Sequence, residues 1–152
     1  MPKFASDEWA KAFKDAVNSN ENYAEAASWW EGDFIFVVKP SGPLDKELKM
    51  FIGLYHGECT GAKALDDDED YDILPPNTDP RPLEEGKKVG AEFEFSGTYD
   101  NWVKVLKKEL DPIQGLMAGK FKLVGNMAKV MRATKAAQEL VNSTTMVDTE
   151  FY

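Results

Sequence analysis

The chain has 152 residues, of which 43% are hydrophobic and 12% aromatic, and its formal net charge is −9. This length is typical of one domain that can bury a core without disulfides or metals. Cys59 is the only cysteine, which excludes an internal disulfide and favours a reducing, cytoplasmic setting. Asp7 and Glu8 precede any apolar run, so we expect no signal peptide, and no segment approaches the roughly 20 apolar residues that span a bilayer.

The charge is distributed unevenly along the chain. Residues 1–97 hold 10 Lys and Arg against 21 Asp and Glu, a net −11, whereas residues 98–141 hold 8 against 4, a net +4. A nucleic-acid-binding surface needs a larger basic excess, so we expect no nucleic-acid partner. The basic residues are typical of a solvated surface, but they leave open a transient contact with an anionic membrane. They are Lys104, Lys107, Lys108, Lys120, Lys122, Lys129, Arg132 and Lys135.

Two helices are predicted within residues 1–32. Ser6, followed by two acidic residues, is a typical helix start, and the polar residues 18–20 separate the first helix from a shorter second one that Gly32 ends. Each helix has one apolar face, formed by Trp9, Phe13 and Val17 in the first and by Tyr23, Ala27 and Trp30 in the second.

Three strands are predicted next. "DFIFVVKP", residues 33–40, is apolar on both faces and therefore indicates a central strand. "KMFIGLYHGE", residues 49–58, alternates as a strand does, and Gly57 bends the chain into "ECTGAKAL", residues 58–65.

Residues 66–88 have a different composition. "DDDEDYD" is followed by prolines 75, 76, 80 and 82, which are incompatible with a regular helix or a central strand. We expect a long surface loop, and its length leaves open whether it is a functional lid or an insertion.

Helices dominate the rest of the chain. "AEFEFSG", residues 91–97, predicts a strand with Phe93 and Phe95 facing in and Glu92 and Glu94 facing out. A helix through Leu110, a short helix from Asp111-Pro112 to Gly119, a strand over 120–123 and a last helix capped by Asn126 follow. The apolar stripe of the last helix is Met127, Val130, Met131, Thr134, Ala137 and Val141, and residues 142–152 form a tail without a clear period.

The order of these elements predicts an α+β domain with a mostly antiparallel sheet covered on one face by helices. We expect one domain over residues 1–152. It consists of the N-terminal helices 1–32, a core over 33–141 and the tail 142–152.

Catalytic and metal-binding patterns are scarce. His56 and Cys59 are the only His and Cys, and residues three apart on a strand point to opposite faces, so we expect no catalytic pair. There is no nucleophile elbow, too few ligands for zinc, and no calcium loop in the acidic run. The sequence therefore predicts a protein that is not an enzyme and has no metal or cofactor.

The apolar residues after Gly97 permit two interpretations. They can fill a packed core, or they can line a cavity. Two methionines in the stripe of the last helix favour the cavity, because methionine is flexible and polarizable and adapts to variable apolar ligands.

The stretch "AEFEFSGTYDNWVKVLKKELDPIQGLMAGKFKLVGNMAKVM" resembles the sterol carrier protein type 2 domain family. The matching features are a strand at Phe93–Gly97, a polar helix start at Thr98–Asn101, Asp111-Pro112, Gly119-Lys120, and Gly125-Asn126 before an amphipathic helix. Including the earlier strands, the resemblance covers residues 33–141. The N-terminal helices with Trp29-Trp30, the acidic loop and an ending without a peroxisomal signal are departures from the animal pattern.

The resemblance implies a five-stranded sheet with helices on one side and an apolar tunnel between them. It implies non-catalytic binding, and transfer, of a fatty acid, an acyl-CoA or a sterol-like lipid. The alternative is an accessory module that presents a lipid-like intermediate or a surface to a partner enzyme. The residues predicted to line the tunnel are Phe93, Phe95, Trp102, Leu106, Ile113, Leu116, Met117, Phe121, Leu123, Met127 and Met131.

Overall fold

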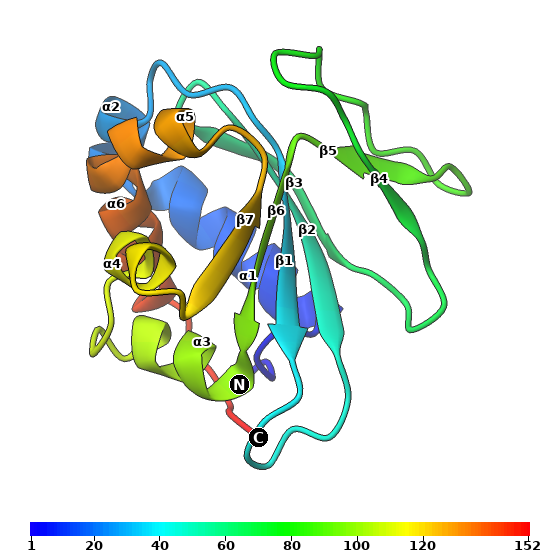
Figure 1. Cartoon of the computed structure of the whole chain (residues 1–152), viewed down its shortest axis with the longest axis vertical. Coiled ribbons are helices and arrows are strands. Elements are labelled where there is room, and N and C mark those ends of the chain that lie inside the picture. The colour runs from blue at the N-terminus through cyan, green and yellow to red at the C-terminus, as the bar shows by residue number, and fades with distance from the viewer.

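The computed structural model describes all 152 residues and arranges them in layers (Figure 1). A five-stranded sheet lies in the middle, helices cover one face, and a two-stranded sheet lies beside the other face. The predicted α+β class and one-sided helical cover are confirmed. The helices are α1 (Asp7–Ser19), α2 (Glu21–Ala26), α3 (Tyr99–Leu106), α4 (Pro112–Met117), α5 (Met127–Arg132) and α6 (Thr134–Thr144). The strands are β1 (Phe34–Lys39), β2 (Leu48–Tyr55), β3 (Glu58–Ala64), β4 (Tyr71–Ile73), β5 (Val89–Ala91), β6 (Phe93–Thr98) and β7 (Phe121–Val124).

The large sheet has the strand order β3-β2-β1-β6-β7, so β1 is central, as its two apolar faces predict. Only the β1–β6 pair is parallel; the other neighbours are antiparallel. The tight turn between β2 and β3 consists of His56 and Gly57, whose φ angles are 48° and 82°. Two positive φ angles suit a two-residue hairpin, and a Cβ at Gly57 would lie 2.5 Å from the Ala24 carbonyl oxygen.

Helix α1 begins as predicted and is bound to strand β3. The Ser6 hydroxyl accepts a hydrogen bond from the first turn of α1. Asp7 Oδ1 accepts from the Ala64 amide at 3.0 Å, and the Asn18 side chain pairs with both backbone groups of Cys59 at 2.8 and 3.0 Å. These contacts hold both ends of the helix against the sheet while its apolar face packs inward.

The prediction of a loop over residues 66–88 is wrong in part. Tyr71–Ile73, just ahead of the prolines, forms strand β4. It pairs in parallel with β5, which follows the prolines. Val89 and Ala91 of β5 join the sheet residues Ile35, Val37 and Phe51 in a second apolar cluster. Strand β5, with Tyr71 of β4 packed against the same cluster, therefore covers part of the face of the sheet that the helices leave open.

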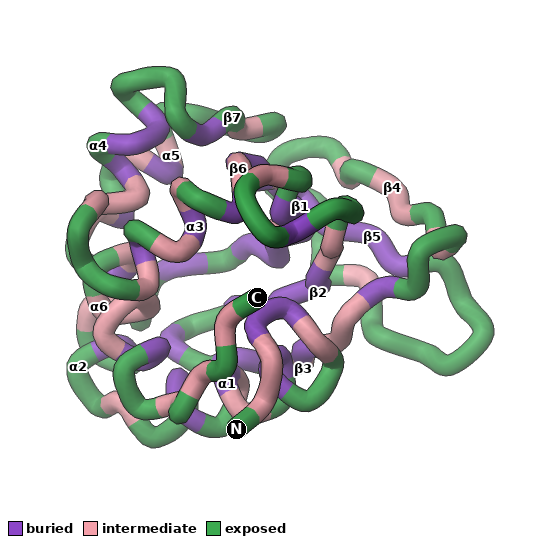
Figure 2. The backbone as a smooth tube through the Cα atoms, turned by 90° about the horizontal axis from the view of Figure 1, so that it is seen from below, coloured by how far each residue is buried: buried purple, intermediate pink, exposed green.

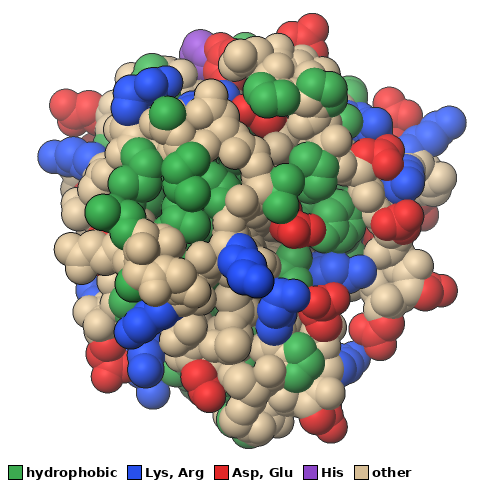
Figure 3. Space-filling view, in the orientation of Figure 1, with side chains coloured by type: hydrophobic (Ala, Val, Ile, Leu, Met, Phe, Trp, Pro, Cys, Tyr) green, Lys and Arg blue, Asp and Glu red, His purple; other side chains and the backbone are tan.

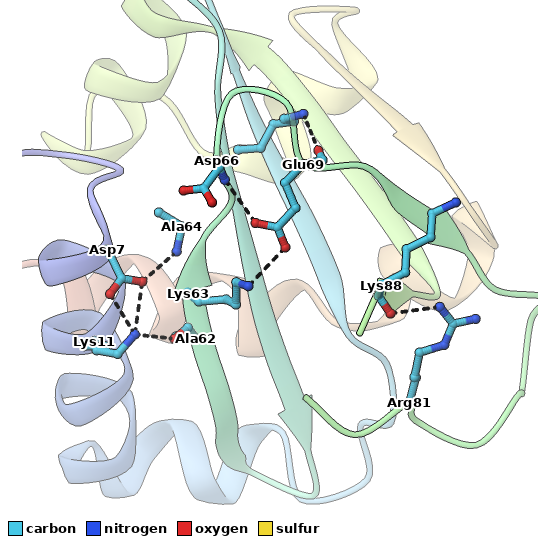
Figure 4. A network of polar contacts seen from close by, with 10 residues as sticks. Asp7, Lys11, Ala62, Lys63, Ala64, Asp66, Glu69, Arg81 and Lys88 are labelled. Carbon is cyan, nitrogen blue, oxygen red and sulfur yellow. Dashed lines mark hydrogen bonds and ion pairs between the residues drawn. The ribbon is translucent and has the colours of Figure 1, made fainter. Parts of the chain in front are cut away.

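Ion pairs tie this segment down, as Figure 4 shows for part of the network. Lys63 of β3 meets Glu69 at 3.0 Å, and Arg81 meets Asp72 at 2.9 Å while donating to the Lys88 carbonyl at 3.1 Å. Most of these side chains are partly solvated, so each pair adds little stability alone. Together they fix where the segment crosses the sheet.

Three further details differ from the prediction. Helix α3 ends at Leu106 rather than Leu110, because the amides of Glu109 and Leu110 both bond to the Lys104 carbonyl and close the helix. The last helix is two helices, α5 and α6, which meet at Ala133, and α6 extends into the predicted tail. Glu92, expected to face out, is 6% exposed, because Lys129 gives it an ionic partner at 3.1 Å.

Buried residues concentrate on the central strands and on the helix faces that point to them (Figure 2). Phe121 of β7 shows how tightly this layer packs. A Cβ at Gly97 or at Gly115 would lie 2.5 or 2.9 Å from its ring. The two glycines therefore make room for a ring that stacks on Phe95 with centroids 4.8 Å apart.

Candidate functional site

An apolar cavity of about 100 Å³ lies between the sheet and the helices. The strands contribute aromatic rings, α1 contributes Trp9 and Phe13, and α3, α4 and α6 close the opposite side. The lining residues are Phe4, Trp9, Phe13, Phe34, Phe36, Met50, Phe95, Trp102, Val105, Leu106, Pro112, Ile113, Val130, Ala137, Leu140, Val141 and Thr144.

The two tryptophans in this wall have their polar atoms satisfied elsewhere. Trp102 Nε1 donates to the Val37 carbonyl at 3.0 Å, and Trp9 Nε1 donates to Thr149 Oγ1 at 2.9 Å. The indole rings therefore present their apolar surfaces to the cavity without a polar cost.

A second apolar cavity, of about 50 Å³, adjoins the first. Both are lined by Phe34, Val130, Ala137 and Leu140. The two spaces are therefore neighbours that share apolar side chains between them.

The structure distributes the predicted tunnel residues over four environments. The cavity is lined by Phe95, Trp102, Leu106 and Ile113. Phe93, Leu116 and Phe121 are buried without lining it, and Leu123 and Met131 pack at the edge of the core. Met117 and Met127 are 71% and 47% exposed on the surface.

Sequence reasoning did not select the lining residues from the first half of the chain. The periodicity marks Trp9 and Phe13 as one face of a helix, and Phe34 and Phe36 as part of a strand, but neither pattern distinguishes packing from lining. Val130 lines both cavities, whereas its neighbour Met131 lines neither. The stripe of the last helix contains both residues and does not tell which of them meets the open space.

His56 and Cys59 lie in different surroundings. His56 Nε2 is 2.6 Å from Glu31 Oε2 at the surface, and this contact lowers the pKa of Glu31. Cys59 is buried, and burial raises the pKa of its thiol to about 12, so it remains protonated at neutral pH.

We therefore expect His56→Ala and Cys59→Ser to leave the affinity for a long-chain probe within a few-fold of wild type. Titration of each folded variant with the probe measures this. A loss above about tenfold, with the circular dichroism spectrum unchanged, would show that this hairpin takes part in the site.

A polar pocket of about 70 Å³ lies between the starts of β1 and β6, helix α5 and residues 74–80. Asp33 and Glu92 line it, and each is 6% exposed. Burial, with a smaller effect of the nearby Glu92 charge, raises the pKa of Asp33 to about 6. Lys129 is the cation of this pocket, and its Nζ also lies over the Trp30 and Phe93 rings at 5.0 and 5.5 Å.

The raised pKa of Asp33 predicts that its charge destabilises the fold. When folding raises the pKa of a carboxyl from 3.8 to about 6, the free energy of unfolding falls as pH increases from about 4 to 6. A pKa difference of one between the folded and unfolded protein corresponds to about 1.36 kcal/mol. Asp33→Asn should therefore raise the free energy of unfolding at pH 8 by about 1–3 kcal/mol and by almost nothing at pH 4. Urea unfolding at both values tests this, with the exposed Asp68→Asn as control. A variant less stable than wild type at pH 8 would contradict it.

No three His, Cys, Asp or Glu side chains are placed to hold a metal ion together. None of the helices combines the length and hydropathy needed to cross a membrane.

The sequence comparison and the structural comparison point to the same protein family. A sequence model of the SCP-2 sterol transfer family matches residues 45–138. A crystal structure of sterol carrier protein 2 superposes with a TM-score of 0.75 at 29% identity, covering 95% of this chain and 99% of that one. The solution structure of a conserved hypothetical protein from Thermus thermophilus, described as possibly a sterol carrier protein, gives a TM-score of 0.77 at 28% identity, with 99% and 93% covered.

A more distant structure shares the fold. It is the solution structure of sterol carrier protein domain 2 of Helicoverpa armigera, with a TM-score of 0.52 at 20% identity, covering 89% of this chain and 87% of that one. No curated protein matches the chain in sequence.

Proposed function

The chain belongs to the SCP-2 sterol transfer family, and we propose that it binds one lipid molecule in the apolar cavity between sheet and helices. The family supports lipid binding and transfer in general. The observation that carries the proposal for this chain is a cavity whose lining is almost entirely aliphatic and aromatic. A fatty acid, an acyl-CoA chain or a sterol-like ligand would be held there by burial of apolar surface.

We expect the cavity to widen when it is occupied, since ligand sites usually measure about 300–1,000 Å³. The walls are suited to this. Helices α4 and α5 have six residues each, and the shared residues Val130 and Leu140 stand between the two apolar spaces. We expect their displacement to join the two spaces into one longer cavity.

Binding without catalysis is the role that these residues support. The cavity wall offers no carboxylate, imidazole or thiol. Cys59 is buried as a thiol, and His56 lies in a surface turn beside Glu31. A single free cysteine also supports a cytoplasmic carrier.

An interaction surface is the second candidate. Met117, Val124 and Met127 are exposed on α4, β7 and α5, beside the exposed Lys120 and Lys122. Figure 3 shows apolar side chains gathered on this side of the molecule. Exposed methionines next to lysines suit transient contact with an anionic membrane or with a partner enzyme.

The experiment that tests the carrier is probe binding by the delipidated protein. Burying about ten methylenes at ~0.8 kcal/mol each gives ~8 kcal/mol before the costs of association, so we expect micromolar affinity or better. Fatty acid, acyl-CoA and sterol competitors then rank the ligand classes, and mass spectrometry of a solvent extract identifies any co-purified lipid. No saturable binding and no extracted lipid would refute the carrier and favour the interaction surface.

A further inference from the structure

The polar pocket at the start of β1 and β6 is not explained by an apolar ligand. It lies at the end of the sheet near α5 (top of Figure 1), where residues 74–80 of the acidic segment close it. Asp33 precedes β1, Glu92 precedes β6, and Lys129 reaches in from α5. Three distant parts of the sequence thus bring charged side chains into one buried space.

Each buried carboxylate has one oxygen without a protein donor. Asp33 Oδ1 accepts from the Leu54 amide at 3.0 Å, and Glu92 Oε2 accepts from Lys129 Nζ at 3.1 Å. The other oxygen of each receives no hydrogen bond from the protein. No fully enclosed side-chain oxygen lacks a partner, so these two oxygens are accessible, and both residues line the pocket. Buried carboxylate oxygens require donors, which a ligand can provide.

The net charge of the pocket determines whether it attracts a positively or a negatively charged ligand. Glu31, Asp33, Asp79 and Glu92 line it, against Lys129 alone. The Glu31 carboxylate also contacts His56 outside the pocket, and the Glu31 main-chain carbonyl accepts a hydrogen bond from Lys129. With these groups ionised the balance is negative, so an anionic head group would be repelled and a cation attracted.

The donors and acceptors in the pocket indicate which kind of cation it can bind. The carboxylates are not grouped as a metal site requires. A ligand with several N–H donors on one small centre suits two carboxylates that line the same pocket, and about 70 Å³ holds only a small group. We propose that this pocket binds a primary ammonium group between Asp33 and Glu92.

The ammonium group can come from two sources. Lys129 faces this pocket and lies over the Trp30 and Phe93 rings, while the next residue, Val130, lines both apolar cavities. A long-chain amine could therefore place its tail among the helices and its head here, which rests on the proposed lipid binding. A short amine would occupy the pocket alone and does not.

Butylamine, butanol and butyrate are the matched short probes, with laurylamine and lauric acid as the long ones. The amide of Leu54, which donates to Asp33, reports occupancy by NMR in the wild-type protein. We expect butylammonium, but neither butanol nor butyrate, to shift this signal saturably. Laurylamine should bind at least tenfold more tightly than lauric acid if the two spaces are joined, and about as tightly as lauric acid if they are not.

Variants locate the ammonium group. Asp33→Asn and Glu92→Gln should each weaken amine binding about tenfold or more, while Glu94→Gln, two residues further along in β6, should not change it. If Glu92→Gln does not fold, Asp33→Asn and the wild-type Leu54 signal still decide. The proposal is overturned if butylammonium leaves that signal unmoved, or if Asp33→Asn binds amines as well as wild type does. Lauric acid binding together with an unmoved Leu54 signal in butylammonium would keep the carrier and refute only this site.

Discussion

Replacing Trp102 with alanine is expected to lower the free energy of unfolding by about 3–5 kcal/mol, the usual cost of removing a buried tryptophan. Its ring contacts Phe36, Phe95 and Phe121 with centroids 5.3, 5.7 and 5.2 Å away. Its Nε1 also satisfies the Val37 carbonyl of the central strand. The loss is therefore both of packing and of a buried hydrogen bond. Urea unfolding of the delipidated variant measures it.

Trp29→Ala is the matched control, because Trp29 is 44% exposed. We expect it to cost less than about 1 kcal/mol, as surface substitutions usually do. Equal losses at the two positions would mean that the Trp102 ring is not part of a tightly packed core.

Val130→Phe is expected to weaken long-chain ligand binding by about tenfold or more. Val130 lines both apolar cavities, so a larger ring there fills space that the ligand needs. Displacing about two methylenes at ~0.8 kcal/mol each accounts for a loss of this size. The unliganded fold should change little, because the ring enters an existing space and overpacking is limited. Probe titration and urea unfolding of the same preparation measure the two effects.

Met131→Phe, one residue further along α5, provides the comparison. Met131 packs at the edge of the core and lines neither cavity, so the affinity of this variant should stay within about threefold of wild type. A tenfold loss at Met131 with none at Val130 would restore the prediction that the methionine stripe forms the wall.

Much of this fold could be predicted from sequence because the signals are local. The apolar run of β1, the Asp111-Pro112 start of α4 and the Asn126 cap of α5 each depend on neighbouring residues, and the structure confirms all three. The parallel β1–β6 pairing was not predicted, because it joins segments about 60 residues apart and leaves no local mark.

The site was harder to predict than the fold. A stripe of apolar residues shows which face of a helix is inside, but not whether that face meets a side chain or a space. In α5, Met127 is 47% exposed whereas Val130 is buried, although both belong to the same predicted stripe. The buried charges were missed for a related reason, since Glu92 alternates as an outward residue and only Lys129, 37 positions later, makes its burial tolerable.

Nuclear Overhauser contacts between a ¹³C-labelled lauric acid and the protein test the central claim most directly. If the lipid lies between sheet and helices, its methylene protons should contact the side chains of Trp102, Ile113 and Val130, which line the cavity. Saturable binding with contacts only to the exposed Met117, Val124 and Met127 would contradict an internal site and place the lipid on the surface.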